Sequence, residues 1–179
     1  MVGKRTLPLI LLAVLPLALV ACGGASKHAE PAGNAVVKGF GFQFEAPTGW
    51  TTKSTGMATE ARRDAAGHAI VSATAFTLLK PYSPKLFPKA AKELDRIAAK
   101  LAAQSHSKLS ESKTITVDGQ TVRAYRLTVH PTSGLSFVER IGFVLLGMRE
   151  YQLFCRAPVG SSDPDGACAL LYATFKTSP

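Results

Sequence analysis

The sequence predicts an α+β fold in which helices pack against an antiparallel sheet. Segments with alternating apolar and polar residues, a pattern typical of half-buried strands, lie on both sides of one amphipathic helical segment. Short connections rich in Gly, Pro and Asp join most of these segments, as in hairpins. The order of strands, helix, strands and a last helix favours α+β over a regular alternation of strands and helices.

The first strands are expected between residues 40 and 79. Phe40, Phe42 and Phe44 alternate with other residues, which gives one strand an aromatic face. Together with Trp50 this face could line a ligand pocket, but packing of a sheet on a helix is the simpler explanation. The next two strands should form a hairpin over residues 57–63 and 68–79.

A long amphipathic helix is predicted to follow and to end near Gln104. It begins either at Pro84, after a Ser83 cap, or at Pro88, because proline suits the first helical position. Apolar residues recur at steps of three and four, which predicts one buried stripe. The stripe comprises Leu86, Ala90, Leu94, Ile97 and Leu101.

Four further strands and a short helix should complete the fold. Asp118-Gly119 is a strong hairpin signal between two of these strands. A turn is expected at Gly147-Met148, and Asp165 is well placed to cap the last helix. The predicted strands are residues 109–117, 120–130, 135–146 and 150–157, and the predicted helix is residues 167–176.

The N-terminus follows the pattern of a secretory signal. Lys4 and Arg5 precede an apolar run over residues 7–21, which is too short to predict a spanning helix. The run ends in Leu19-Val20-Ala21-Cys22, which resembles the lipobox of bacterial lipoproteins. The resemblance implies cleavage before Cys22 and a lipid on that cysteine, as a membrane anchor. The alternatives are an ordinary cleaved signal peptide and an uncleaved N-terminal helix.

Cleavage at that point has consequences for length, charge and location. It removes 21 of 179 residues and leaves 158, which suits one domain. Small polar residues then predict a flexible tether over residues 22–36, so residues 37–179 would form the domain, at a membrane on the extracytoplasmic side of the cell envelope. The loss of Lys4 and Arg5 lowers the net charge from +9 to +7. A basic domain suits anionic partners, and no nucleic-acid-binding motif is present.

The remaining cysteines, Cys155 and Cys168, predict a disulfide. Oxidising compartments favour such a pair in an exported chain, and the loop-entropy model gives a stabilisation of about 3 kcal/mol. Two buried free thiols are the alternative. A metal site is disfavoured because neither a CxxC motif nor a histidine cluster accompanies the pair.

Basic residues also recur along the predicted long helix, opposite its apolar stripe. From residue 80 to residue 113 the chain has eight basic and three acidic side chains. Such a face is either simply solvated or, in a membrane-tethered protein, a binding surface for anionic head groups. The residues of the basic face are Lys89, Lys92, Arg96 and Lys100.

No motif for catalysis, a cofactor or a metal is found. GxSxG, HExxH, P-loop and GxGxxG sequences are absent, and residues 161–166 lack the Glu that a calcium loop requires. We therefore expect no enzyme, no cofactor and no metal. A hydrolase would require His68, His106 or His130 to meet Ser or Asp in a cleft, and a carrier of lipids or other hydrophobic ligands would require an apolar cavity.

The pattern Phe-x-Phe-x-Phe-x-Ala-Pro-x-Gly-Trp over residues 40–50 resembles the start of PsbP/Mog-like and LpqN-like domains. The mid-chain helix, the Val117-Asp118-Gly119-Gln120 hairpin and the C-terminal helix are similar too. The resemblance covers about residues 37–177 and implies an α-β-α sandwich. Family members act mainly as binding or assembly factors, and some are secreted bacterial lipoproteins. The expected function is therefore a membrane-anchored, non-enzymatic binding or assembly module whose partner is an envelope protein or an anionic surface.

Overall fold

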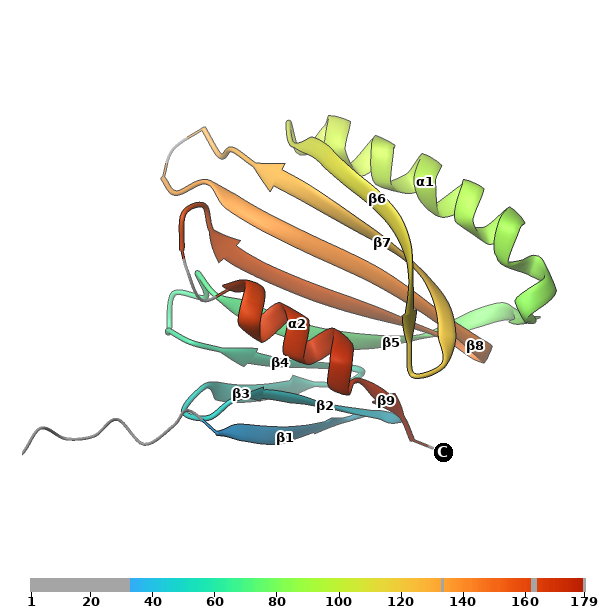
Figure 1. Ribbon diagram of the computed structural model, residues 1–179, viewed down its shortest axis with the longest axis horizontal. Helices are drawn as coiled ribbons and strands as arrows, with labels where there is room; N and C mark the ends of the chain where they lie inside the picture. The colour runs from blue at the N-terminus through green and yellow to red at the C-terminus, as the bar shows by residue number, and fades with distance from the viewer. Residues whose placement is uncertain (1–32, 133, 162–163, 179) are drawn as a thin grey trace, which may run out of the picture. The chain divides into compact units, whose positions relative to one another are not determined.

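Two antiparallel sheets and two helices form the fold in the computed structural model, which describes residues 33–132, 134–161 and 164–178 (Figure 1). The larger sheet has the order β3-β4-β5-β8-β7-β6, and the smaller has the order β1-β2-β9. The strands are β1 (Asn34–Gly39), β2 (Phe42–Pro47), β3 (Thr51–Thr55), β4 (Ala58–Arg62), β5 (Ile70–Tyr82), β6 (Lys108–Val117), β7 (Gln120–Val129), β8 (Phe137–Pro158) and β9 (Lys176–Thr177). The helices are α1 (Phe87–Gln104), preceded by a 3₁₀ turn (Pro84–Leu86), and α2 (Pro164–Thr174).

The segment β8 folds back on itself in the middle of the larger sheet (Figure 1). Its first half pairs with β7, from Val129↔Phe137 onward, and its second half pairs with β5 up to Ile70↔Arg156. The sequence predicted two strands here with a turn at Gly147-Met148, and the structure confirms this prediction. Arg156 donates to the Glu139 carboxylate at 2.6 Å, and the Val159 amide donates to the Ser136 carbonyl at 2.9 Å, so the two halves of β8 lie side by side. Gly147 has a positive φ of 57°, which suits a tight hairpin turn, and the two halves run in opposite directions, the first beside β7 and the second beside β5 (Figure 1).

The smaller sheet adds a strand that the sequence analysis missed. Strand β1 begins at Asn34, so the folded part starts three residues before the predicted boundary at residue 37. Strand β3 was missed as well, because all five of its residues are exposed and it lacks the alternation that marks a half-buried strand. Both strands are defined by pairing with a neighbouring strand, and their own apolar pattern does not predict them.

The main core lies between the larger sheet, α2 and the smaller sheet. Phe42 and Phe44 are almost fully buried there, and the Phe42 ring lies 5.9 Å from Phe175 and 6.0 Å from Tyr151, measured between centroids. The aromatic alternation of the sequence thus marks core packing. Phe40 is half exposed at the β1–β2 turn, where the Arg149 guanidinium lies 4.7 Å from its ring centroid.

The two helices pack on opposite faces of the larger sheet. Successive strand residues point to opposite faces, and Val122 belongs to the cluster that includes α2, whereas Tyr125 belongs to the cluster that includes α1. Figure 1 shows α2 in front of the sheet, with α1 running along β6 and β7. The architecture is therefore the α+β sandwich that the sequence predicted.

Candidate functional site

Helix α1 contacts the sheet through a different stripe from the one predicted. Leu94, Ala98 and Ala102 are buried, against a sheet surface that includes Tyr125 and Phe143. The rings of Tyr125 and Phe143 fill the space under the helix, so small alanine side chains face them. Leu94 was correctly expected to be buried. The same expectation is wrong for the other large residues of the stripe, because Leu86, Ile97 and Leu101 are 46 %, 38 % and 46 % exposed.

A polar clamp fixes this orientation of α1. Arg123 on β7 donates two hydrogen bonds to the Asp95 carboxylate, at 2.8 and 3.1 Å, and the Tyr125 hydroxyl donates a third at 2.7 Å. The hydrogen bonds from Arg123 lower the pKa of Asp95, whereas burial raises the pKa of Tyr125. The bidentate geometry holds one side of the helix onto β7 and turns the other side outward.

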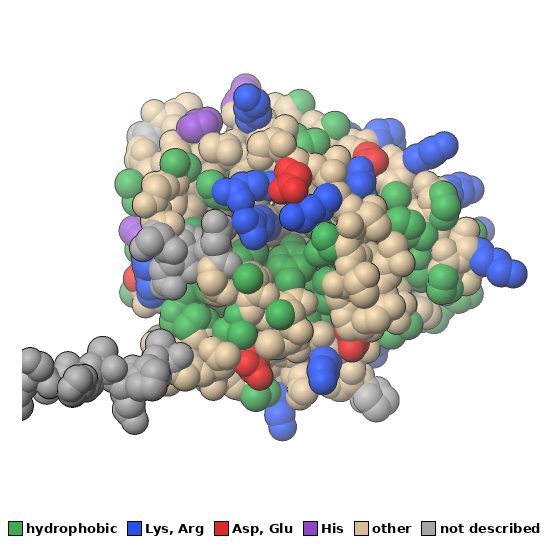
Figure 2. All heavy atoms as spheres, in the orientation of Figure 1, with side chains coloured by type: hydrophobic (Ala, Val, Ile, Leu, Met, Phe, Trp, Pro, Cys, Tyr) green, Lys and Arg blue, Asp and Glu red, His purple; other side chains and the backbone are tan. Residues whose placement is uncertain are grey.

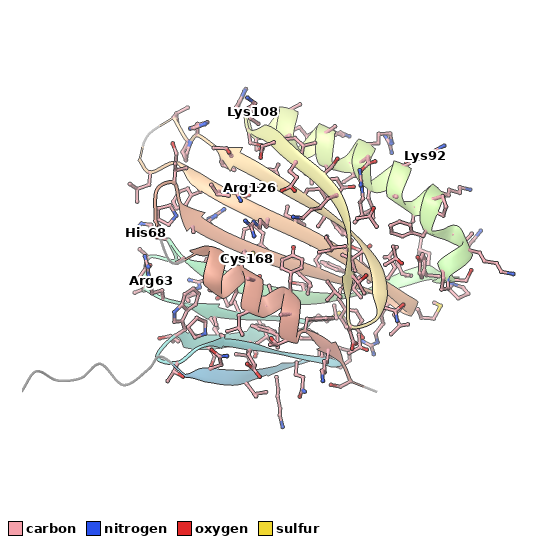
Figure 3. All side chains as sticks on the ribbon, viewed as in Figure 1. Arg63, His68, Lys92, Lys108, Arg126 and Cys168 are labelled. Atoms are coloured by element: carbon pink, nitrogen blue, oxygen red, sulfur yellow. A yellow bond between two sulfur atoms is a disulfide. The ribbon has the colours of Figure 1, made fainter. Side chains whose placement is uncertain are left out.

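The basic face of α1 is exposed as predicted, at Lys89, Lys92, Arg96 and Lys100. Figure 3 shows Lys92 projecting from the helix into solvent. Arg96 donates through Nε to Glu93 at 3.1 Å, a hydrogen bond that raises the pKa of Arg96. The three lysines form no ion pair with any described residue, so they contribute most of the positive potential of this face.

An apolar flank adjoins the basic face. Its exposed members are Leu86, Ile97 and Leu101. We call these three residues, together with the basic face (Lys89, Lys92, Arg96 and Lys100), the α1 surface. Where β5 departs from regular pairing after Thr77, Leu79 is fully exposed on the same segment of chain as Lys80. Large apolar residues that remain exposed beside basic ones are typical of an interaction surface.

A groove of about 420 Å³ runs between this flank and the strands. Leu78, Tyr82 and Leu145 lie on its strand side, with Glu150 among them, and burial raises the pKa of Glu150. The groove is open to solvent, which differs from the enclosed cavity that a carrier of lipids or other hydrophobic ligands would use. The groove therefore extends the α1 surface toward the strands β5 and β8.

Cys155 and Cys168 form the expected disulfide, with their Cα atoms 5.6 Å apart. Cys155 is on β8 and Cys168 is inside α2, so the bond joins a strand to a helix. Both residues are buried, and neither is available as a nucleophile or metal ligand.

The histidines do not assemble a catalytic cleft in the described part of the chain. His68 bonds Asp64 through its backbone at 3.2 Å, while its ring stacks on Phe137. His130 shares a hydrogen bond of 2.9 Å with Ser136, and no described carboxylate bonds to its ring. His106 follows the end of α1. Among the residues with described coordinates, no group of three His, Cys, Asp or Glu side chains is placed to hold a metal.

The predicted anchor lies outside the described residues. Cys22, the signal peptide and the tether up to residue 32 belong to that part of the chain, so lipidation of Cys22 stays a prediction. No helix within the described ranges combines the length and apolar character needed to cross a membrane.

Comparison with known proteins supports the fold and leaves the function open. No family model matches the chain, and no curated protein matches it. Solved structures do match. The solution structure of cyanobacterial PsbP (CyanoP) from Synechocystis sp. PCC 6803 superposes with a TM-score of 0.56 at 13 % identity, over 89 % of this chain and 98 % of that protein.

Two further structures share the architecture. LpqN of Mycobacterium tuberculosis, described as involved in cell envelope biogenesis, matches with a TM-score of 0.54 at 12 % identity, over 85 % of this chain and 88 % of its own. A protein of Bacteroides thetaiotaomicron VPI-5482 matches with a TM-score of 0.57 at 13 % identity. The match covers 83 % of this chain but only about half (49 %) of the Bacteroides protein. These identities show the fold alone, and the chain is an α+β module with the fold of PsbP and LpqN.

Proposed function

We propose that this protein is a lipid-anchored, extracytoplasmic binding or assembly module, without enzymatic activity, that lays its α1 surface on an anionic membrane. The observation that carries the proposal is the pairing of two features on one exposed helix. Lys89, Lys92 and Lys100 supply positive charge, and Ile97 and Leu101 supply apolar contacts beside it. Helices that lie in a membrane interface have this composition and bury their apolar side to a depth of roughly 5–10 Å.

The lipobox-like sequence supports the same arrangement. A lipid on Cys22 would leave residues 23–33 as the link to β1, and a chain of about 11 residues spans at most ~40 Å. The domain would thus stay within reach of the bilayer, where the effective concentration of head groups is high. The solved structure of LpqN, a protein described as involved in cell envelope biogenesis, supports the location by similarity of fold.

Electrostatics sets the size of the expected effect. Each Lys or Arg near an anionic bilayer contributes about 1 kcal/mol, and this falls off beyond a Debye length of about 8 Å at physiological salt. Arg96 should contribute less than the lysines, because Glu93 neutralises part of its charge. Three lysines thus correspond to a difference in affinity of up to about 100-fold at low salt.

Vesicle binding tests this proposal with a charge-matched control. Residues 23–179 are titrated with vesicles of phosphatidylglycerol and phosphatidylcholine, and with phosphatidylcholine alone. The variant K89Q/K92Q/K100Q should bind the anionic vesicles at least about tenfold more weakly than the wild type. The variant K38Q/K53Q/K176Q loses the same charge from exposed positions on β1, β3 and β9, and should bind almost as the wild type does. Equal weakening of both variants, or no binding by the wild type, would refute a role for α1.

The anchor is tested separately, in cells. Mass spectrometry of the mature protein should find Cys22 as the first residue, carrying acyl chains, and Cys22→Ala should release the protein from the membrane fraction. A mature N-terminus elsewhere, without lipid, would remove the lipoprotein part of the proposal.

A further inference from the structure

An irregular stretch of β5 exposes a leucine at one end of the larger sheet, close to the start of α1. Thr77 pairs with Arg149 of β8, and Tyr82 pairs with Gly147. The four residues of β5 between these pairs therefore lie opposite Met148 alone. A bulge of this kind bends the strand and directs side chains away from the sheet. Leu79, inside the bulge, is fully exposed as a result.

The turn of β8 adds two large apolar side chains at the same end of the sheet. Leu146 and Met148 flank Gly147 and are 39 % and 46 % exposed. Together with Phe40, they line an open hollow of about 630 Å³. We call Leu79, Leu146 and Met148 the sheet-end patch. Large apolar side chains that remain exposed as a group are typical of an interaction surface.

Basic side chains flank the sheet-end patch. Lys80 and Lys85 are exposed, and neither forms an ion pair with a described residue. The Arg149 guanidinium, which lies over the Phe40 ring, borders the open hollow. The sequence has no Asp or Glu in residues 77–92 or 140–149. Figure 2 shows Lys and Arg side chains beside hydrophobic ones at the right of the view, where Figure 1 places the start of α1 and the turn of β8.

The sheet-end patch is continuous with the α1 surface. Lys80 and Pro81, which follow Leu79 directly, line the same groove as Leu86 of the α1 surface. The 3₁₀ turn Pro84–Leu86 is the connection between β5 and α1. A partner that covers the start of the α1 surface therefore also meets the sheet-end patch.

We propose that the sheet-end patch inserts into the anionic bilayer on which the α1 surface lies, with its three apolar side chains below the phosphates. This inference rests on the proposed function, because the bilayer is the same partner. Lys80, Lys85 and Arg149 then lie at the level of the phosphates, and the lysine stems lie along apolar chains. A bilayer suits side chains that project from a bulge and a turn, because liquid hydrocarbon surrounds them without a complementary pocket, whereas a protein partner would need one.

A fluorophore attached to single introduced cysteines measures the depth of insertion. The fragment used for vesicle titration has no free thiol, since Cys155 and Cys168 are bonded to each other. Nitrobenzoxadiazole can therefore be attached at one position in each of three variants, Leu79→Cys in the patch, Ile97→Cys on the α1 surface and Thr51→Cys on β3. The vesicles contain phosphatidylglycerol and phosphatidylcholine with bromine near the end of the acyl chains, which quenches a probe only within the hydrocarbon.

The three variants should respond differently. Bromine should quench the probe of Leu79→Cys by at least about half and that of Thr51→Cys by less than about a tenth, and Ile97→Cys should gain emission with weaker quenching, because α1 lies in the interface. A response of Ile97→Cys without quenching of Leu79→Cys would overturn the inference and leave the proposed function intact. Quenching of Leu79→Cys alone would support insertion of the patch and refute the role of the α1 surface. No response of either would overturn both.

Unlabelled variants give a second measurement that does not depend on the probe. L79A/M148A should weaken binding to the same phospholipid vesicles at least about tenfold at physiological salt, where charges are screened and the apolar contacts contribute most. L135A/V159A removes half-exposed apolar side chains from the opposite end of the larger sheet, and should bind as the wild type does. Equal affinity of L79A/M148A and the wild type would also overturn the inference.

Discussion

The packing of α1 predicts opposite outcomes for two neighbouring apolar residues, Leu94 and Ile97. The sequence pattern places both in one buried stripe, whereas in the structure Leu94 is 8 % exposed and Ile97 is 38 % exposed. Truncation to alanine removes about three methylene-sized groups at either position. Only at Leu94 do these groups fill space against Tyr125, Leu127 and Phe143.

The expected losses follow from this difference in burial. Leu→Ala in a core costs about 2–5 kcal/mol, and the value at Leu94 should lie in the lower half of this range, because the cluster under α1 is small and close to the surface. Ile97→Ala should cost less than about 1 kcal/mol, since much of the side chain is already in water. If the α1 surface binds membranes, Ile97→Ala should weaken vesicle binding although it hardly affects stability.

Urea unfolding at equilibrium measures both losses. Circular dichroism follows the helices, and the fluorescence of Trp50, the only tryptophan, reports the main core against which it packs. Coincident transitions would justify a two-state free energy. Equal losses for Leu94→Ala and Ile97→Ala, or a greater loss for Ile97→Ala, would show that the helix is rotated from the orientation described and would refute the assignment of its exposed flank.

Two further predictions concern the disulfide and Glu150. The double variant Cys155→Ala/Cys168→Ala should lose about 3 kcal/mol, which lowers the midpoint of thermal unfolding by roughly 6–12 °C, and a shift under about 2 °C would contradict a structural role. Burial raises the pKa of Glu150 above its unfolded value, so its contribution to stability is fully present below the unfolded pKa and is lost as the pH rises through the folded pKa. Glu150→Gln should therefore raise the urea midpoint relative to wild type at about pH 7 and change it little at about pH 3.5. A gain of the same size at both pH values would show that titration is not the cause.

The sequence predicted the elements with strong periodicity and missed those defined by their partners. The amphipathic period of α1 and the Asp118-Gly119 hairpin are local signals, and both structures are present. Strand β3 has no exposed–buried alternation, and it exists because β4 pairs with it. The turn within β8 was predicted as well, because glycine and a change of apolar phase usually indicate a turn. Here they mark the turn between the two antiparallel halves of β8, of which the first pairs with β7 and the second with β5.

Local patterns and strand register differ in how visible they are in the sequence. Lys89, Lys92 and Lys100 recur at helical spacing, so the exposed basic face was predicted. The pairing of two arginines on the other face was not, because Arg126 and Arg140 are 14 positions apart and lie opposite each other only through the register of β7 and β8. Register depends on the turn and on the pairing of whole strands. No local pattern around either arginine contains that information.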